Sequence, residues 1–146
     1  MQLTLHTDYA LRVLLYLAHF PDRRSNTAEI SNAFGISKNH LVRVVQHLQE
    51  AKFVTAHMGR GGGIVLAAPP DKIRLGDVVR ACERNLAVVE CFNQESNTCP
   101  IVPVCGLKSP LRSALQSFLN TLDQYTLADV IQPNSHNRFV KLLLPG

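Results

Sequence analysis

The 146-residue chain has no apolar run long enough to cross a lipid bilayer. Its most apolar segment, LRVLLYLAHF, is interrupted by Arg12 and followed by Pro21. No basic segment precedes that run, so a secretory signal peptide is not expected. Hydrophobic residues make up 46% of the chain and charged residues 18%, which predicts a single folded, cytoplasmic protein and not a disordered one.

Several motifs of enzymes and metal sites are absent as well. The four cysteines form no Cys-x-x-Cys pair, which is the usual signature of both a thioredoxin-like site and a zinc knuckle. No catalytic dyad and no nucleotide-binding fingerprint can be named, and there is no internal repeat. An enzyme is therefore the least expected class of protein.

The charge of the chain is unevenly placed. Residues 1–80 carry ten Lys and Arg against six Asp and Glu, a net charge of +4, whereas residues 81–146 carry five against five. A basic half joined to a neutral half favours a polyanion-binding module attached to a part with another task.

The basic half contains the pattern of a helix-turn-helix. A first helix is expected from the N-cap Thr7 and from Asp8 to Pro21, and a short second helix from Asn26 to Gly35. Ser37 then caps a longer helix, SKNHLVRVVQHLQEA, with an apolar face at helical spacing made of Leu41, Val44, Val45 and Leu48.

The polar face of this longer helix is the predicted DNA-reading surface. Its residues point away from the apolar face, and in a helix-turn-helix they would enter the major groove. Arg43 and Asn39 suit guanine and adenine edges, and Lys38 suits phosphate. We expect DNA contacts from Lys38, Asn39, His40, Arg43 and Gln46. The plainer alternative is a pair of core helices with a solvated polar face.

A glycine-rich hairpin is expected directly after this helix. Two β-prone runs, 53–56 and 64–67, flank a tip that holds four of the eight glycines. Such a wing can place Arg60, Gly61 and Gly62 in a narrow minor groove. A phosphate-binding loop is the competing reading, but neither the Lys-Ser/Thr pair nor a helix follows the glycines.

The second half begins with a short helix that reaches Cys82, expected to be a small buried residue. A cysteine-containing loop follows, and Ser109-Pro110 predicts the start of a longer helix, with Ser109 as its cap and Pro110 at its first position. This helix has an apolar stripe that a twin subunit or the protein's own domain must cover: Leu111, Leu115, Phe118, Leu119, Leu122 and Tyr125. The tail from Asn134 shows no pattern that assigns it a role.

The loop between these helices holds the other three cysteines, Cys91, Cys99 and Cys105, with Pro100 and Pro103 between them. Clustered thiols in a cytosolic chain favour metal or redox chemistry over disulfides. Three thiolates on a proline-stiffened loop suit an iron–sulfur cluster, which needs four protein ligands. Ordinary reduced cysteines and a structural zinc site in a protein-interaction module are the alternatives.

The order of these parts resembles the winged-helix iron–sulfur transcription repressors. The resemblance covers nearly the whole chain and rests on LHTDYALRVLLYLA, ISKNHLVRVVQHL, GRGGG, the three-cysteine loop and TLADVI. It implies a mainly α fold with a small β-hairpin wing and a long dimerisation helix. It also implies a homodimer that binds a palindromic operator through 1–80, holds a cluster through 81–108 and dimerises through 109–146.

The resemblance further implies a fourth cluster ligand. In the nitric-oxide-sensing members this ligand is an aspartate of the partner subunit at the start of the first helix, and Asp8 stands at that position. In the 2Fe–2S members that sense redox state or cluster supply, a histidine follows the last cysteine by three residues; here that residue is Lys108. We therefore expect a 4Fe–4S cluster on Cys91, Cys99, Cys105 and Asp8, whose nitrosylation lowers DNA affinity. Asp8 also has a simpler role, because a carboxylate in the first turn stabilises the helix dipole.

Overall fold

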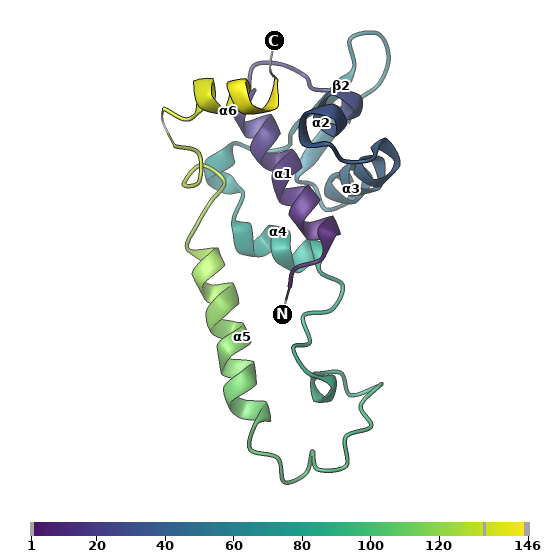
Figure 1. Ribbon diagram of the computed structural model, residues 1–146, viewed down its shortest axis with the longest axis vertical. Helices are drawn as coiled ribbons and strands as arrows, with labels where there is room; N and C mark the ends of the chain where they lie inside the picture. Colours follow the sequence, from purple (N-terminus) through teal and green to yellow (C-terminus); the bar gives the residue numbers. More distant parts are fainter. Residues whose placement is uncertain (1, 133, 145–146) are drawn as a thin grey trace.

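The computed structural model describes residues 2–132 and 134–144. In these residues it contains six α-helices and one two-stranded antiparallel hairpin, and the predicted mainly α fold with a small wing is confirmed. The molecule is elongated (Figure 1): most helices form a body at one end, while α5 (Lys108–Asp123) and the cysteine loop extend below it. Across the described ranges, none of the helices is long and apolar enough to span a membrane.

Helix α1 (Leu5–His19) runs through the middle of the body, and its start differs from the prediction. The N-cap is Thr4, whose side-chain oxygen accepts a hydrogen bond from the Thr7 amide. Thr7 was predicted as the cap but lies inside the helix and is fully buried. The two threonines are three residues apart, so either could satisfy the capping pattern, and only burial separates them. Asp8 remains in the first turn, as predicted.

Helices α2 (Thr27–Phe34) and α3 (Lys38–Glu50) form the predicted helix-turn-helix. Asn26 caps α2 by accepting from the Glu29 amide, and Ser37 caps α3 by accepting from the His40 amide. The chain turns at Gly35, which adopts the left-handed conformation that glycine tolerates best. Buried Ser31 fixes the turn, because its hydroxyl donates to the Ile36 carbonyl at 2.6 Å.

Strands β1 (Val54–His57) and β2 (Gly63–Leu66) pair in antiparallel register and form the wing. Both lie within one residue of the predicted runs. A backbone bridge joins the wing to the loop before α2: Ser25 and Ile64 exchange hydrogen bonds at 3.1 and 2.8 Å. Because Ile64 pairs with Ala56 close to the tip, this bridge holds the hairpin against the body near its tip end.

After the short 3-10 turn Pro70–Lys72, helix α4 (Leu75–Cys82) returns under α1 and ends at the predicted residue. The 3-10 turn Glu90–Phe92 interrupts the cysteine loop. Helix α5 begins at Lys108, and no side chain caps it, so the prediction of a Ser109 cap with Pro110 at the first helical position was wrong. Arg80 of α4 forms a two-pronged ion pair with Asp123 of α5, with both contacts at 2.6 Å.

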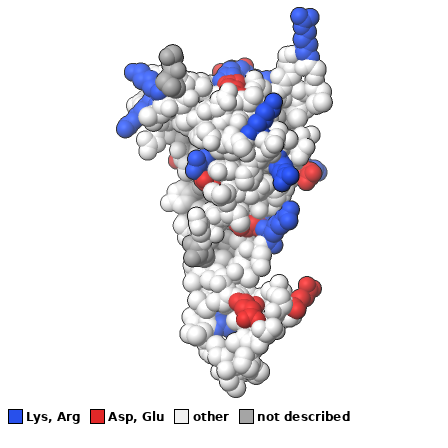
Figure 2. Space-filling view, turned by 45° about the vertical axis from the view of Figure 1, so that its right-hand side comes forward, with Lys and Arg blue, Asp and Glu red and all other residues white. Residues whose placement is uncertain are grey.

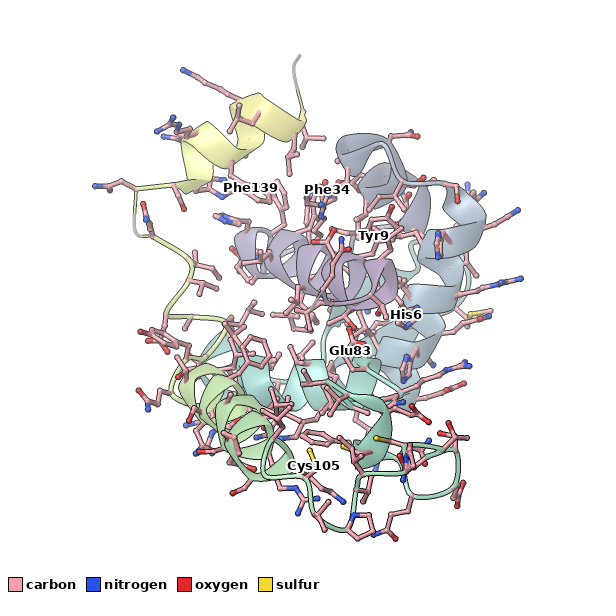
Figure 3. The ribbon with its side chains drawn as sticks, turned by 60° about the horizontal axis from the view of Figure 1, so that its bottom comes forward. His6, Tyr9, Phe34, Glu83, Cys105 and Phe139 are labelled. Carbon is pink, nitrogen blue, oxygen red and sulfur yellow. The ribbon has the colours of Figure 1, made fainter. Side chains whose placement is uncertain are left out.

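A further helix, α6 (His136–Leu143), lies in the tail to which no role was assigned. It packs on the C-terminal end of α1, where the ring of Phe139 stacks on that of His19 with a centroid separation of 3.9 Å. Figure 3 shows Phe139 directed toward the body from α6. The chain thus returns to its first helix after passing through the lower part of the molecule.

The hydrophobic core is concentrated around α1 and α3. All four residues of the predicted apolar face of α3 are buried. They pack with a group of α1 side chains that are at most 2% exposed: Ala10, Val13, Leu14, Tyr16 and Leu17. This core fixes the orientation of the polar face of α3.

Candidate functional site

The polar face of α3 is presented to solvent over its whole length. All five of its predicted DNA-contacting residues are exposed: Lys38, Asn39, His40, Arg43 and Gln46. The ring edge of His40 meets the ring of Tyr9 from α1, with the centroids 5.3 Å apart. The first turn of α3 is therefore fixed against α1 while its outer side chains stay free to meet another surface.

The tip of the wing lies beyond β1 and β2, with Arg60 and Gly61 exposed and Gly62 half-buried. Gly62 is required sterically, because a Cβ there would lie 2.3 Å from the carbonyl oxygen of His57. The guanidinium of Arg24 donates to the Gly61 carbonyl oxygen at 3.2 Å. Arg24 was not among the predicted site residues. It adds a positive charge and a fixed contact at the base of the tip.

Lys and Arg side chains are concentrated on the body of the molecule and are fewer on its lower extension. Figure 2 shows most of the visible Lys and Arg side chains over the body, and one at the far tip of its upper end. The lower extension shows few charged side chains on this face, and the acidic ones are more prominent than the basic. This agrees with the net charge of +4 in residues 1–80 and favours contact of the body with a polyanion.

The three loop cysteines lie in the lower extension. Cys91, Cys99 and Cys105 are free thiols and half-buried. The segment between the first two is held by Glu90, whose carboxylate accepts a hydrogen bond from the Thr98 hydroxyl at 2.6 Å. The Thr98 side chain and backbone amide together lower the pKa of Glu90, which keeps that carboxylate charged.

The third cysteine is placed beside the start of α5. Cys105 lines an open hollow with Lys108, Ser109 and Arg112. The Arg112 guanidinium also lies over the ring of Phe92, 5.8 Å from its centroid, and so connects α5 with the start of the loop. Cys105 thus shares this hollow with two cationic side chains, Lys108 and Arg112.

Asp8 lies on α1, in the body. Its carboxylate is paired with Arg12 one turn later, through Nη2 at 2.6 Å and Nε at 3.2 Å. Both side chains are 42% exposed. Within one chain Asp8 therefore has a partner, and it remains accessible to a second subunit.

A different group of potential ligands converges in the body. The side chains of His6, His47 and Cys82 offer ligand atoms that all lie within 4.8 Å of one another. Among the residues that the structure describes, the loop cysteines do not form such a group. Sequence reasoning missed this group, because its members are far apart in the chain and belong to three helices.

Cys82 is buried, as predicted, with 4% of its surface exposed. Burial, together with the charge of Glu83, raises the pKa of its thiol to about 11. Burial is also the main factor that lowers the pKa of His6, followed by the neighbouring His47. Both groups are therefore uncharged near neutral pH.

The donor set of the loop fits an iron–sulfur cluster. Three free thiols on one irregular loop supply three of the four ligands that a cluster needs, and no disulfide consumes them. Asp8 has the oxygen chemistry for the fourth position, but it would have to leave Arg12. The residues present thus fit a cluster with one ligand from outside the loop.

The fold and the exposed α3 and wing define the class of protein: a winged helix-turn-helix DNA-binding regulator. Residues 3–133 match the profile of Rrf2, described as an iron-dependent transcriptional regulator. The chain therefore belongs to the Rrf2 family, and the resemblance found in the sequence is confirmed.

Relatives in this family are transcription regulators. The chain is 48% identical over 132 residues to the HTH-type transcriptional regulator NsrR of Halalkalibacterium halodurans, covering 90% of each chain. It is 47% identical over 133 residues to NsrR of Bacillus subtilis, covering 90% of this chain and 91% of the relative. The solved structure of T. potens IscR is 25% identical with a TM-score of 0.70, over 88% of this chain and 85% of that one. The prediction of a DNA-binding transcription regulator, and not an enzyme, is confirmed by these relatives.

Proposed function

We propose that the protein is a homodimeric transcription repressor that loses DNA affinity when nitric oxide reacts with its iron–sulfur cluster. The observation that carries this proposal is the union, in one chain, of an exposed DNA-reading face with a loop of three free, half-buried cysteines. The resemblance to nitric-oxide-sensing repressors supports the choice of signal.

The proposed DNA contacts divide into base reading and positioning. Arg43 and Asn39 lie on the exposed face of α3 and would meet base edges in the major groove, with His40 and Gln46 beside them. Lys38, at the start of α3, would bind phosphate. On the wing, Arg60 with Gly61 and Gly62 would enter the adjacent minor groove, and Arg24 would hold this tip in position.

The lower extension supports dimerisation. Of the predicted α5 stripe only Leu119 is buried in the single chain, and Tyr125 is 48% exposed. Near the start of the helix three further apolar side chains are exposed: Ile101 at 54%, Val104 at 86% and Leu107 at 66%. Exposed apolar side chains in this number favour a symmetric contact with a second copy of the chain.

Cys91, Cys99 and Cys105 would hold a 4Fe–4S cluster, with Asp8 of the partner subunit as the fourth ligand. When bound, the cluster supplies iron to which nitric oxide can bind. Asp8 would join the first helix of one subunit to the cysteine loop of the other. Its release would return the carboxylate to Arg12 and free the two subunits to change orientation. Because half-sites lie roughly 34 Å apart, a small rotation prevents both α3 helices from docking together.

Gel-shift titrations test the proposal directly. Anaerobic, cluster-loaded protein should bind operator DNA tightly and sediment at twice the mass of the chain, and nitric oxide should weaken DNA binding strongly. Equal DNA affinity before and after nitric oxide would refute the sensing function. Mössbauer spectra of the same protein distinguish the proposed 4Fe–4S cluster from a 2Fe–2S cluster. Bound zinc without iron or sulfide would support the zinc alternative.

Asp8→Ala tests whether Asp8 is the fourth cluster ligand, and Arg12→Ala is the matched control. Both variants remove the same partly exposed ion pair, which contributes at most about 1 kcal/mol to stability. Only Asp8→Ala also removes the proposed cluster ligand, so it alone should alter the cluster spectrum. If the two variants have the same cluster spectrum, Asp8 acts only through the helix and its ion pair.

A further inference from the structure

We propose that His6, His47 and Cys82 form a second metal site, which binds one divalent transition-metal ion of the zinc class. This site lies in the body and is independent of the cysteine loop. Its ligands come from the start of α1, the last turn of α3 and the end of α4. Its existence does not depend on the proposed cluster.

The three side chains already face one another. The Nε2 atom of His6 and the Nδ1 atom of His47 are 2.8 Å apart and share a hydrogen bond. Their rings are tilted, with centroids 5.0 Å apart. The Sγ atom of Cys82 completes the group, in which all ligand atoms lie within 4.8 Å of one another. Figure 3 shows His6 at the start of α1 near Glu83, well separated from Cys105.

The donor types and spacing suit zinc. Zn²⁺ binds histidine nitrogen at about 2.0–2.1 Å and cysteine sulfur at about 2.3 Å, so two nitrogen ligands of a tetrahedral ion are separated by roughly 3.3 Å. The two histidine nitrogens would have to move apart by roughly 0.5 Å from their hydrogen-bonded separation. A two-histidine, one-cysteine set also excludes calcium and magnesium, which prefer oxygen.

The fourth coordination position faces an open pocket. This pocket has a volume of about 380 Å³ and is lined by the three proposed ligands together with Thr4, Glu83 and Arg84. Water can therefore reach the ion. One oxygen of the Glu83 carboxylate is engaged by the Thr4 amide at 2.7 Å and the Thr4 hydroxyl at 3.1 Å, which holds Glu83 beside the site.

Metal binding would exchange one set of bonds for another. The His6–His47 hydrogen bond opens, and the proton on its donor nitrogen moves through solvent to the other nitrogen of the same ring. Each ring then directs a nitrogen lone pair at the ion. The S–H bond of Cys82 breaks, its proton leaves to solvent, and a sulfur–metal bond forms. The oxidation state of the metal does not change.

An ion at this position would join three functional parts of the chain. His47 belongs to the helix that presents the DNA-reading face, and His6 lies two residues before Asp8. Cys82 ends the helix from which the chain enters the cysteine loop. Occupancy would thus fix the end of α3 against α1 and α4.

Cobalt titration of a full-length loop-serine protein, with Cys91→Ser, Cys99→Ser and Cys105→Ser, tests the site. The sequence has four cysteines, so Cys82 is the single thiol left and no cluster can form on the loop. We expect one equivalent of Co²⁺ to bind with a thiolate-to-cobalt band in the near ultraviolet and tetrahedral bands in the visible, and Zn²⁺ to displace it. Absence of the thiolate band would overturn the proposal, whether or not the wild-type loop holds a cluster.

Variants in the loop-serine protein assign the ligands. Cys82→Ser should remove the near-ultraviolet band. Because Cys82 is buried and that variant could fail to fold, His6→Gln and His47→Gln provide a second test at half-buried positions. Each should weaken Co²⁺ binding on the order of tenfold or more. His57→Gln, on strand β1, is the matched control and should leave affinity unchanged. Equal affinity in all three histidine variants would refute the assignment.

Discussion

The body and the lower extension of this molecule differ in how far each is complete within one chain. All but three of the buried hydrophobic residues lie before residue 80, and those three are Cys82, Leu119 and Leu127. The loop and the start of α5 instead expose Ile101, Val104 and Leu107. The body contains almost the whole buried core, whereas the extension has exposed apolar side chains and free thiols.

Under the proposed function, this difference separates a stable DNA-reading region from a region that responds to a signal. A DNA-reading face must keep one orientation, and the hydrophobic core beneath α3 holds this helix in place. A sensing loop must respond to a ligand, and a segment with few buried contacts changes at lower free-energy cost. The two regions are connected through α4, which packs on α1 and forms the Arg80–Asp123 ion pair with α5.

The largest expected effect is on the stability of the body. Leu14 is fully buried in α1, so Leu14→Ala should reduce the free energy of unfolding by about 2–5 kcal/mol. Val104, which is 86% exposed in the extension, should change it by no more than about 0.5 kcal/mol when replaced by Ala in cluster-free protein. Urea denaturation followed by circular dichroism measures both. Similar losses would show that the extension contributes to the folded core.

The second-largest expected effect is a loss of DNA affinity when residues of α3 are replaced. Arg43→Ala should cost about 1–3 kcal/mol of operator affinity and relax the preference for one base. Lys38→Ala should weaken binding to all sequences alike and reduce the slope of affinity against salt concentration. Fluorescence anisotropy with operator and scrambled DNA at several salt concentrations separates the two. An Arg43→Ala protein with unchanged base preference would disprove the groove assignment.

Local sequence patterns predicted the body well. The caps Asn26 and Ser37, the Gly35 turn and the apolar face of α3 are all encoded within a few residues, and the structure has each of them. The first cap was placed wrongly, because Thr4 and Thr7 both fit the pattern and only tertiary burial of Thr7 distinguishes them. The Ser109-Pro110 pattern also placed the start of α5 wrongly, because the helix begins two residues earlier, with Leu107 as its N-cap and Lys108 as its first residue.

Contacts between segments that are distant in the sequence could not be predicted from local sequence patterns. The His6–His47–Cys82 group and the Arg24 contact to Gly61 join parts of the chain that no spacing rule connects. The docking of α6 involves the stack of Phe139 on His19, two residues that lie far apart in the sequence. The cluster ligands Cys91, Cys99, Cys105 and Asp8 remain predictions that rest on residue type and family resemblance.

A smaller effect on stability is expected from the loop between α1 and α2, which contacts the wing. Glu29 accepts hydrogen bonds from Arg23 and from the Tyr16 hydroxyl, and these contacts hold the segment that carries Arg24. The bond from Arg23 is the main cause that lowers the pKa of Glu29, while burial and the Glu29 contact raise the pKa of Tyr16 to about 12. Glu29→Gln should therefore reduce stability at neutral pH by about 1 kcal/mol.

The pH dependence of this effect has a definite sign. Because the folded-state pKa of Glu29 lies below its ordinary value of 4.5, its contribution is present above that pH and is lost as the pH falls through the folded-state pKa. The difference between wild type and Glu29→Gln should disappear in acid. Glu50→Gln, exposed at the end of α3, is the control and should change stability little. A difference independent of pH would show that the Glu29 charge is not what stabilises this segment.

The smallest effect should appear where α6 returns to the body. The pKa of His19 is lowered mainly by burial and further by His136, so the folded state favours the neutral ring. The docking of α6 should be fully stable above 6.5 and weaken as the pH falls below that value. Hydrogen-exchange protection of α6 at about pH 7.5 and about pH 5.5 measures this change. His19→Gln, which cannot titrate, should give the same protection at both values. If wild type also shows no change, the stack of His19 on Phe139 does not limit the docking of α6.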